Sequence, residues 1–167
     1  MDLNKIQPKP KNMKTHCFDQ TWHILAPIND CWTILNNMET FTKGQVFPYK
    51  VEFLAEGTQS PSFSTGVWTN HHGPLLNVCG RIGKIVKHSY RDLNYCYGSY
   101  IVSFRLIRPV RLQFLFDHKA PYTTVTLKLE CYVHQLIYPV WSMIQNIFWK
   151  SFKWSISKKI IKSKSND

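Results

Sequence analysis

Hydrophobic and polar residues alternate along most of the chain between residues 49 and 133, which is the pattern of strands with one buried face. The alternation is cleanest in the last predicted strand, where Val125, Leu127, Leu129 and Cys131 are predicted to face inward. Turn residues recur about every ten residues, which predicts an antiparallel meander whose neighbouring strands pair directly. The other strands are predicted at residues 49–54, 62–70, 75–80, 82–90, 95–104 and 112–116, with turns at 57–61, 71–74, 91–94, 108–109 and 117–121.

The pattern changes to a helical period near the C-terminal end of the chain. A long helix is predicted from residue 138 to about residue 162, with Pro139 in its first turn, where the missing N–H has no helical partner to lose. Lysines crowd its last turns and complement the helix dipole. The apolar stripe predicted to face the sheet consists of Val140, Trp141, Ile144, Ile147, Phe148, Phe152 and Ser155.

A second helical segment follows a predicted strand near the N-terminal end. Pro27 cannot continue a strand ladder because it has no N–H, so the chain is predicted to turn there. Asn29 or Asp30 is predicted to cap the helix that follows, since both side chains accept hydrogen bonds from free backbone N–H groups. Another short helix or turn is predicted at residues 40–47.

The segment Ile24–Asn36, in which Ala26 and Pro27 precede Trp32, resembles the opening of the SRPBCC superfamily. This helix-grip group includes START lipid-transfer domains, polyketide cyclases and Bet v 1-like pathogenesis-related plant proteins. The resemblance implies an α+β fold, in which a curved antiparallel sheet of about seven strands wraps on a long C-terminal helix. Members of the group differ in activity, so the resemblance implies the fold more specifically than the function.

The resemblance covers residues 15–162, which are expected to form one ligand-binding domain. Residues 1–14 are polar and basic, and they are expected to form a flexible arm. Residues 163–167 are expected to form a basic tail.

The chain is 44% hydrophobic and 14% aromatic, which excludes disorder and predicts an interior lined by rings. Together with the resemblance, this composition implies a cavity between the sheet and the terminal helix that binds a hydrophobic small molecule or lipid. The alternative is that the rings fill a solid core. The predicted lining consists of Trp68, Tyr95, Tyr97, Tyr100, Phe104, Phe114, Phe116, Trp141, Ile144 and Phe148, with Leu112 and Phe152 beside them.

The same resemblance implies an alternative function, a polyketide cyclase or aromatase that acts in this cavity. In such enzymes an arginine and tyrosines polarise a polyketone and stabilise its enolate. Arg111 with Tyr95, Tyr97 or Tyr100 is the candidate catalytic set, and the alternative for this arginine is a basic rim at a hairpin tip. His71 and His72 are predicted to lie in a solvated turn, since adjacent strand residues cannot easily hold one metal. The alternative is a catalytic role, with one imidazole pointing into the mouth of a cavity.

The chain has a formal net charge of +11 and a pI of about 9.5, so an anionic partner is expected. Lys158, Lys159 and Lys162 are predicted to contact an anionic membrane surface, and the alternative is that they only complement the helix dipole. A third function, a basic module that binds RNA or an acidic protein, depends on charge alone. Nucleic acid is not the expected partner, because no recognised nucleic-acid module is present.

Five cysteines stand singly, without the paired spacing of a zinc site or a disulfide framework. No metal and no cofactor are expected, and scattered reduced thiols are typical of a cytoplasmic protein. The first residues lack the apolar core of a signal peptide, and no apolar run approaches the ~18 residues of a membrane span. The cytoplasm is therefore the expected location.

Overall fold

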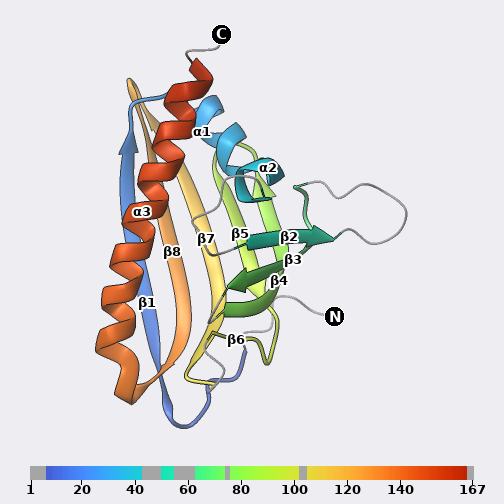
Figure 1. Cartoon of the computed structure of the whole chain (residues 1–167). Helices are drawn as coiled ribbons and strands as arrows, with labels where there is room; N and C mark the ends of the chain where they lie inside the picture. The colour runs from blue at the N-terminus through green and yellow to red at the C-terminus, as the bar shows by residue number, and fades with distance from the viewer. Residues whose placement is uncertain (1–6, 43–49, 55–62, 74–75, 102–104, 165–167) are drawn as a thin grey trace.

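The strands of the chain form one antiparallel sheet that wraps against a long C-terminal helix (Figure 1). The computed structural model describes residues 7–42, 50–54, 63–73, 76–101 and 105–164. Its elements are β1 (Met13–Ile24), α1 (Ile28–Leu35), α2 (Met38–Thr42), β2 (Lys50–Leu54), β3 (Trp68–Gly73), β4 (Leu76–Val86), β5 (Tyr90–Tyr95), β6 (Tyr100–Ile101), β7 (Ile107–Lys119), β8 (Tyr122–His134), a 3₁₀ turn (Gln135–Ile137) and α3 (Tyr138–Lys164). The predicted α+β class is confirmed, with eight strands in the sheet.

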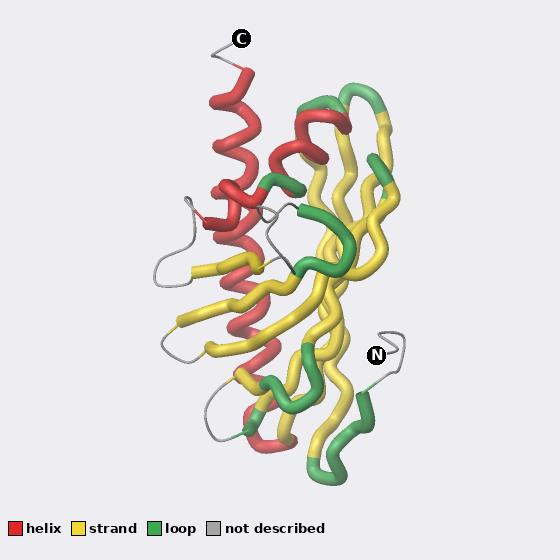
Figure 2. The backbone as a smooth tube through the Cα atoms, turned by 90° about the vertical axis from the view of Figure 1, so that its right-hand side faces the viewer, coloured by secondary structure: helices red, strands yellow, loops and turns green. Residues whose placement is uncertain are grey.

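The sheet is a meander that β1 extends at one edge. The order of its strands is β1-β8-β7-β5-β4-β3-β2, and the short β6 pairs with both β4 and β7. Consecutive strands pair directly from β2 to β5 and from β7 to β8, as the turn spacing predicts. β2 and β3 run crosswise to the long strands β7 and β8 (Figures 1 and 2), so the sheet is strongly curved. α3 lies along β1 and β8 and covers the face that this curve encloses.

The end of the interior beside α1 is filled by packed side chains. Trp22 of β1 is completely buried, and its ring lies 6.2 Å from the Phe114 ring and 5.9 Å from the Phe152 ring. Leu35 of α1 and Ile156 of α3 are buried in the same cluster. The burial of these apolar side chains holds both helices on the sheet.

The turn after β1 contains the predicted proline but not the predicted cap. Thr123 Oγ1 donates a hydrogen bond to the carbonyl oxygen of Ala26 at 2.7 Å, which ties this turn to β8. α1 begins directly after Pro27, and no side chain caps its first turn. The predicted cap at Asn29 or Asp30 is therefore wrong, because both residues already lie within the helix.

Three segments predicted as turns lie within strands. His71 and His72 lie in β3, and residues 91–94 lie in β5. Pro109 lies in β7 where the pairing with β8 shifts register, a position that tolerates the missing N–H. Turn-forming residues enter these strands because neighbouring strands pair with them on both sides, which a local pattern does not reveal. The predicted turn at residues 57–61 lies outside the described residues.

The second half of the predicted flexible arm is packed on the domain. Gln7 is 8% exposed, and its Oε1 accepts a hydrogen bond from Arg108 Nε at 2.8 Å. The carbonyl oxygen of Gln7 accepts a second hydrogen bond, from the Tyr132 hydroxyl, at 2.8 Å. The domain therefore includes residues from Gln7 onward, because the outer face of β7 and β8 offers them buried hydrogen-bond partners, and β1 begins at Met13.

α3 shows a different buried stripe from the predicted one. Pro139 lies in its first turn, as predicted, but Val140 and Ile147 are 52% and 59% exposed. The prediction placed them inward because α3 carries apolar residues on two opposite faces. None of the helices in the described ranges combines the length and the apolar character that crossing a bilayer requires. The buried residues of α3 are Trp141, Gln145, Trp149, Ile156 and Ile160.

Candidate ligand cavity

A cavity of about 280 Å³ lies between the curved sheet and the first half of α3. Its position follows from the curvature, since side chains cannot reach across the whole space between a bent sheet and a straight helix. α3 contributes Trp141, Ile144, Gln145, Phe148, Trp149 and Phe152 to the lining. The sheet contributes apolar side chains from β4, β5, β7 and β8, among them Val78, Ile82, Leu93, Leu112, Phe114 and Leu129.

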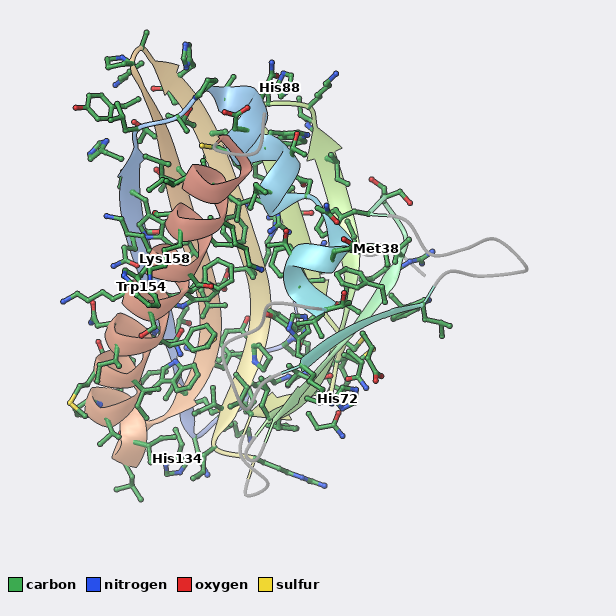
Figure 3. The ribbon with its side chains drawn as sticks, turned by 45° about the horizontal axis from the view of Figure 1, so that its top comes forward. Met38, His72, His88, His134, Trp154 and Lys158 are labelled. Carbon is green, nitrogen blue, oxygen red and sulfur yellow. The ribbon has the colours of Figure 1, made fainter. Side chains whose placement is uncertain are left out.

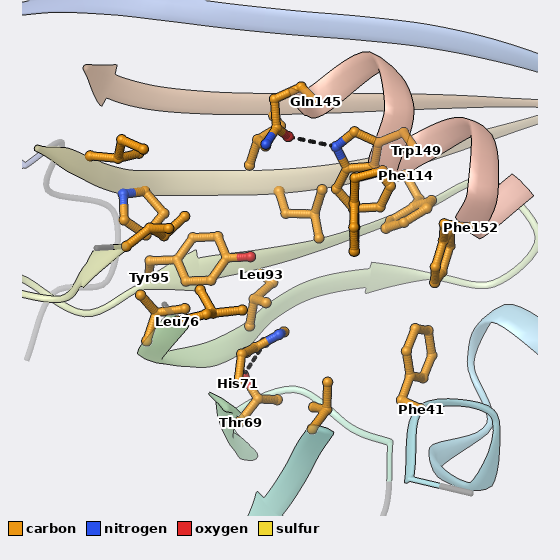
Figure 4. A pocket seen from close by; sticks show the side chains of 18 of the residues that line it. Phe41, Thr69, His71, Leu76, Leu93, Tyr95, Phe114, Gln145, Trp149 and Phe152 are labelled. Atoms are coloured by element: carbon orange, nitrogen blue, oxygen red, sulfur yellow. Dashed lines mark hydrogen bonds between the residues drawn. The ribbon is translucent and has the colours of Figure 1, made fainter. Parts of the chain in front are cut away.

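One histidine points into this cavity from β3 (Figure 4). His71 Nε2 lies 3.3 Å from Thr69 Oγ1, at hydrogen-bond distance, and its ring lies 5.8 Å from the Tyr95 ring. Burial lowers the pKa of His71 to about 4, and electrostatic interactions with His72 and Arg91 act in the same direction. The imidazole is therefore neutral near neutral pH.

One arginine also reaches the cavity, from β5. Arg91 is 6% exposed, and its guanidinium packs among the rings of Phe41, Phe63 and Phe114. Burial lowers the pKa of Arg91 to about 9, so the side chain still carries its positive charge near neutral pH. The described lining residues include no aspartate or glutamate.

Three further polar side chains border the cavity. Gln145 Oε1 accepts a hydrogen bond from Trp149 Nε1 at 2.7 Å (Figure 4). Trp141 Nε1 is buried and has no hydrogen-bond partner among the described residues. Burial raises the pKa of Tyr95 well above its ordinary value, so its hydroxyl stays protonated. The cavity thus presents N–H and O–H donors within mainly apolar surroundings.

Five of the ten residues in the predicted lining border the cavity, and so do Leu112 and Phe152, which were predicted beside them. The five are Tyr95, Phe114, Trp141, Ile144 and Phe148. Trp68 does not line the cavity, because Thr69 and His71 of the same strand face inward and adjacent strand residues face opposite ways. On the outer face, the guanidinium carbon of Arg81 lies 5.3 Å from the Trp68 ring centroid.

The remaining predicted lining residues lie elsewhere. Tyr97 is 67% exposed, and Tyr100 packs on a small apolar cluster formed by Met13, Val110 and Tyr132. Phe116 is buried in the filled end of the interior, where its ring lies 5.0 Å from the Trp32 ring. Phe104 lies outside the described residues.

The predicted catalytic set of Arg111 with Tyr95, Tyr97 or Tyr100 is not assembled in the cavity, since Arg111 does not line it. Arg111 lies on the outer face of the sheet, where its Nε donates a hydrogen bond to Asp92 Oδ2 at 3.0 Å. Asp92 is only 2% exposed and holds this arginine in place. The neighbouring residue Leu112 faces the cavity instead, since strand side chains alternate.

Sequence reasoning missed Arg91 as a cavity residue, and it placed His71 in the cavity only as an alternative. It placed each in a turn, because Arg91 is followed by three residues that resemble a turn and His71 precedes a glycine and a proline. One signal was present in the sequence. Leu93 and Tyr95 follow Arg91 at a period of two, which is the spacing of residues that share one face of a strand.

The lysines predicted to contact a membrane occupy different environments. Lys158 is exposed, and its Nζ lies 3.6 Å from the Trp154 ring centroid on the outer side of α3 (Figure 3). Lys159 instead donates a hydrogen bond to the carbonyl oxygen of Thr40 at 3.0 Å, which ties α3 to α2, and burial lowers its pKa. The side chain of Lys162 lies outside the described residues.

No protein-family model matches this sequence, and no curated protein matches it either. Solved structures match it over most of its length. Norcoclaurine synthase from Thalictrum flavum, in complex with dopamine and hydroxybenzaldehyde, gives a TM-score of 0.64 at 11% identity, over 90% of this chain and 89% of that chain. The Aha1 dimer from Colwellia psychrerythraea gives 0.57 at 9% identity, over 85% and 96% of the two chains. Ara h 8.0201 gives 0.58 at 13% identity, over 89% and 99%.

These neighbours are Bet v 1-like helix-grip proteins, and at such identities the likeness establishes the fold alone. The fold that the opening segment of the sequence resembles is therefore confirmed.

Proposed function

Given its helix-grip fold and ring-lined cavity, we propose that this protein binds a small hydrophobic organic molecule between the curved sheet and α3. The observation that carries the proposal is the cavity of about 280 Å³, which is mainly apolar and bordered by a few polar side chains. Protein interiors are normally close-packed, and the atoms around an empty space lose contacts. A ligand of matching shape would restore these contacts.

The size of the cavity restricts the class of ligand. Ligand sites usually measure about 300–1,000 Å³, so this cavity of about 280 Å³ lies at the small end. One compact aromatic or single-chain molecule fits this volume better than a lipid with two acyl chains. Norcoclaurine synthase, which shares the fold, has been solved with the small aromatic molecules dopamine and hydroxybenzaldehyde. Ile144 borders the cavity and is 44% exposed, so the ligand can enter beside α3.

A neutral apolar fluorophore such as N-phenylnaphthylamine is expected to bind and to quench tryptophan fluorescence, because Trp141 and Trp149 border the cavity. Val78→Phe is expected to weaken this binding about tenfold or more, since the larger ring occupies the ligand's space. Fluorescence titration measures both effects.

The matched control is Val86→Phe, which makes the same change on the same strand at a position that is 40% exposed and outside the cavity lining. It should bind as the wild type does. Saturable binding that survives in a folded Val78→Phe protein would place the ligand elsewhere, and no binding of any apolar probe would refute the proposed function.

We also propose that α3 docks this protein on an anionic membrane surface. Five apolar residues of α3 are each more than half exposed and are spaced three, four, seven and seven residues apart. We call them the outer stripe: Val140, Met143, Ile147, Trp154 and Ile161. At about 100° per residue they fall within roughly 60° of one another, on the side of α3 opposite its buried residues. Lys150 and Lys158 are exposed beside the stripe, which suits anionic headgroups.

Replacing Ile147 and Trp154 together with glutamine is expected to reduce co-sedimentation with phosphatidylserine-containing vesicles about tenfold or more, because an apolar side chain contributes roughly 1.5–3 kcal/mol on burial. Wild-type binding should also fall as salt rises. Leu54→Gln is the control, because Leu54 is 69% exposed on β2, away from the outer stripe. Binding that does not depend on the charge of the lipid would contradict membrane docking. A dimer in sedimentation velocity that the double variant abolishes would also contradict it, because the outer stripe would then bind a second copy of the chain.

A further inference from the structure

Arg91 is buried, and no residue that the structure describes provides it with a countercharge. Its guanidinium carbon lies 4.3 Å from the Phe114 ring centroid, 4.9 Å from that of Phe63 and 5.3 Å from that of Phe41. These cation–π contacts stabilise a positive charge, but they do not accept its N–H hydrogens in the way that an oxygen does. Nε of Arg91 has no hydrogen-bond partner among the described residues.

Two other arginines of the sheet donate to oxygen atoms of the chain. The buried Arg108 donates to Gln7 Oε1 and to the Pro8 carbonyl oxygen. On the outer face, Arg111 donates to Asp92, so that positive charge has a carboxylate partner. Within the described residues no carboxylate pairs with Arg91, and the cavity lining contains none. A buried and unpaired charge is costly unless a partner arrives, so the arginine is placed for a partner that the described residues do not supply.

The remaining polar groups of the cavity also favour an acceptor. The Tyr95 hydroxyl remains protonated and can donate, and the buried Trp141 Nε1 has no acceptor among the described residues. The one amide oxygen among them, Oε1 of Gln145, already accepts from Trp149. His71 is neutral near neutral pH and adds no negative charge. A ligand with an oxygen anion would therefore meet donors, whereas a cationic ligand would meet the charge of Arg91.

We propose that the ligand of this cavity is a hydrophobic monocarboxylic acid, whose carboxylate pairs with the Arg91 guanidinium and whose apolar part fills the ring-lined space. This inference rests on the proposed function and specifies the chemical class of the ligand for the same site. A carboxylate is planar and accepts two N–H groups of one guanidinium side by side. Its single negative charge matches the single cation, whereas a phosphate dianion would leave an excess charge in apolar surroundings.

Isothermal titration with matched pairs of probes tests the proposal. Decanoate is compared with decanol, and naphthoate with naphthalenemethanol, so that each pair shares its carbon skeleton. The wild-type protein is expected to bind each carboxylate at least about tenfold more tightly than the alcohol. Arg91→Met is expected to weaken carboxylate binding on the order of thirtyfold and to leave alcohol binding unchanged or slightly tighter.

Two controls accompany this variant. Lys84→Met removes one positive charge from the same sheet at an exposed position outside the lining, and it should preserve carboxylate binding. Thermal melts without ligand should show Arg91→Met to be no less stable than the wild type, since the change removes an unpaired buried charge. A purely structural arginine would instead give a lower melting temperature and no preference between acid and alcohol.

The outcomes separate the two proposals. If acids and alcohols bind the wild type equally, the cavity binds ligands but Arg91 does not select carboxylates, and this inference is wrong. If decyl phosphate binds more tightly than decanoate, the ligand class is wrong. If no probe binds, the proposed function itself is refuted. If Arg91→Met does not fold, Arg91→Lys is the second variant, because lysine keeps the positive charge but lacks the planar guanidinium. Carboxylate binding that is unchanged in Arg91→Lys would overturn the proposal.

Discussion

Replacing Trp22 with alanine is expected to lower the free energy of unfolding by about 3–5 kcal/mol. The side chain is completely buried, and its ring packs against Phe114 and Phe152. Its Nε1 donates a hydrogen bond to Gln20 Oε1 at 3.0 Å, so the truncation also removes the partner of a polar group. Urea denaturation of the wild type and the variant measures the difference.

Phe148→Ala provides the comparison, since Phe148 borders the cavity on one side. Its truncation should cost less than that of Trp22, because part of its surface already lacks packing neighbours. Equal losses for the two variants would mean that the space beside α3 is as filled as the core around Trp22. A loss below about 1 kcal/mol for Trp22→Ala would contradict the packing at the α1 end.

Replacing Asp92 with alanine is expected to lower the free energy of unfolding by about 3 kcal/mol or more. The buried carboxylate accepts from the Tyr90 hydroxyl at 2.9 Å and from the Lys84 backbone N–H at 2.7 Å, in addition to Arg111. The Arg111 side chain is 42% exposed and recovers water when Asp92 is lost, while the Lys84 N–H and the Tyr90 hydroxyl each lose an acceptor. The site is also tight, since a Cβ at Gly83 would clash with Asp92 Oδ1.

The matched control is Asp117→Ala on β7. Asp117 pairs with Lys119 at 3.5 Å, but its side chain is 63% exposed, so the change should cost less than about 0.5 kcal/mol. A loss for Asp92→Ala as small as that of the control would show that the buried network adds nothing to stability. Binding of a neutral probe should survive in Asp92→Ala if the protein folds, because this network lies on the outer face of the sheet.

The local period of the sequence was enough to predict the fold class. β8 alternates so regularly that Val125, Leu127, Leu129 and Cys131 are all buried as predicted. The meander and the long terminal helix follow from turn spacing and from the change of period, and both depend only on neighbouring residues. Pro27 predicted its turn for the same reason, since its lack of an N–H is a property of one residue.

Periodicity also identified part of the cavity. Phe114 and Trp141 line it as predicted, because they are aromatic residues on a strand and a helix that the sequence predicts. Tyr95 also lines it, but as the last residue of β5 rather than the first residue of the predicted strand 95–104. A period does not tell which of two faces points inward, however. α3 carries rings and aliphatic side chains on opposite faces, and only its packing on the sheet decided that Trp149 is buried and that Ile147 is exposed.

Only the tertiary structure determined that Arg91 is the charged residue of the cavity. Arg91 and Asp92 read as a polar turn, yet β5 lies between β4 and β7 and both of these residues are buried. Asp92 is satisfied by Arg111, a residue of another strand, and Arg91 is enclosed by Phe41 and Phe114, which come from distant parts of the chain. The polar composition of a short segment predicts that it is exposed only when water solvates its polar groups. Here the partners are side chains that the fold brings together across β4, β7 and α2, so the sequence determined the sheet and the helix, whereas the fold determined which charge lies between them.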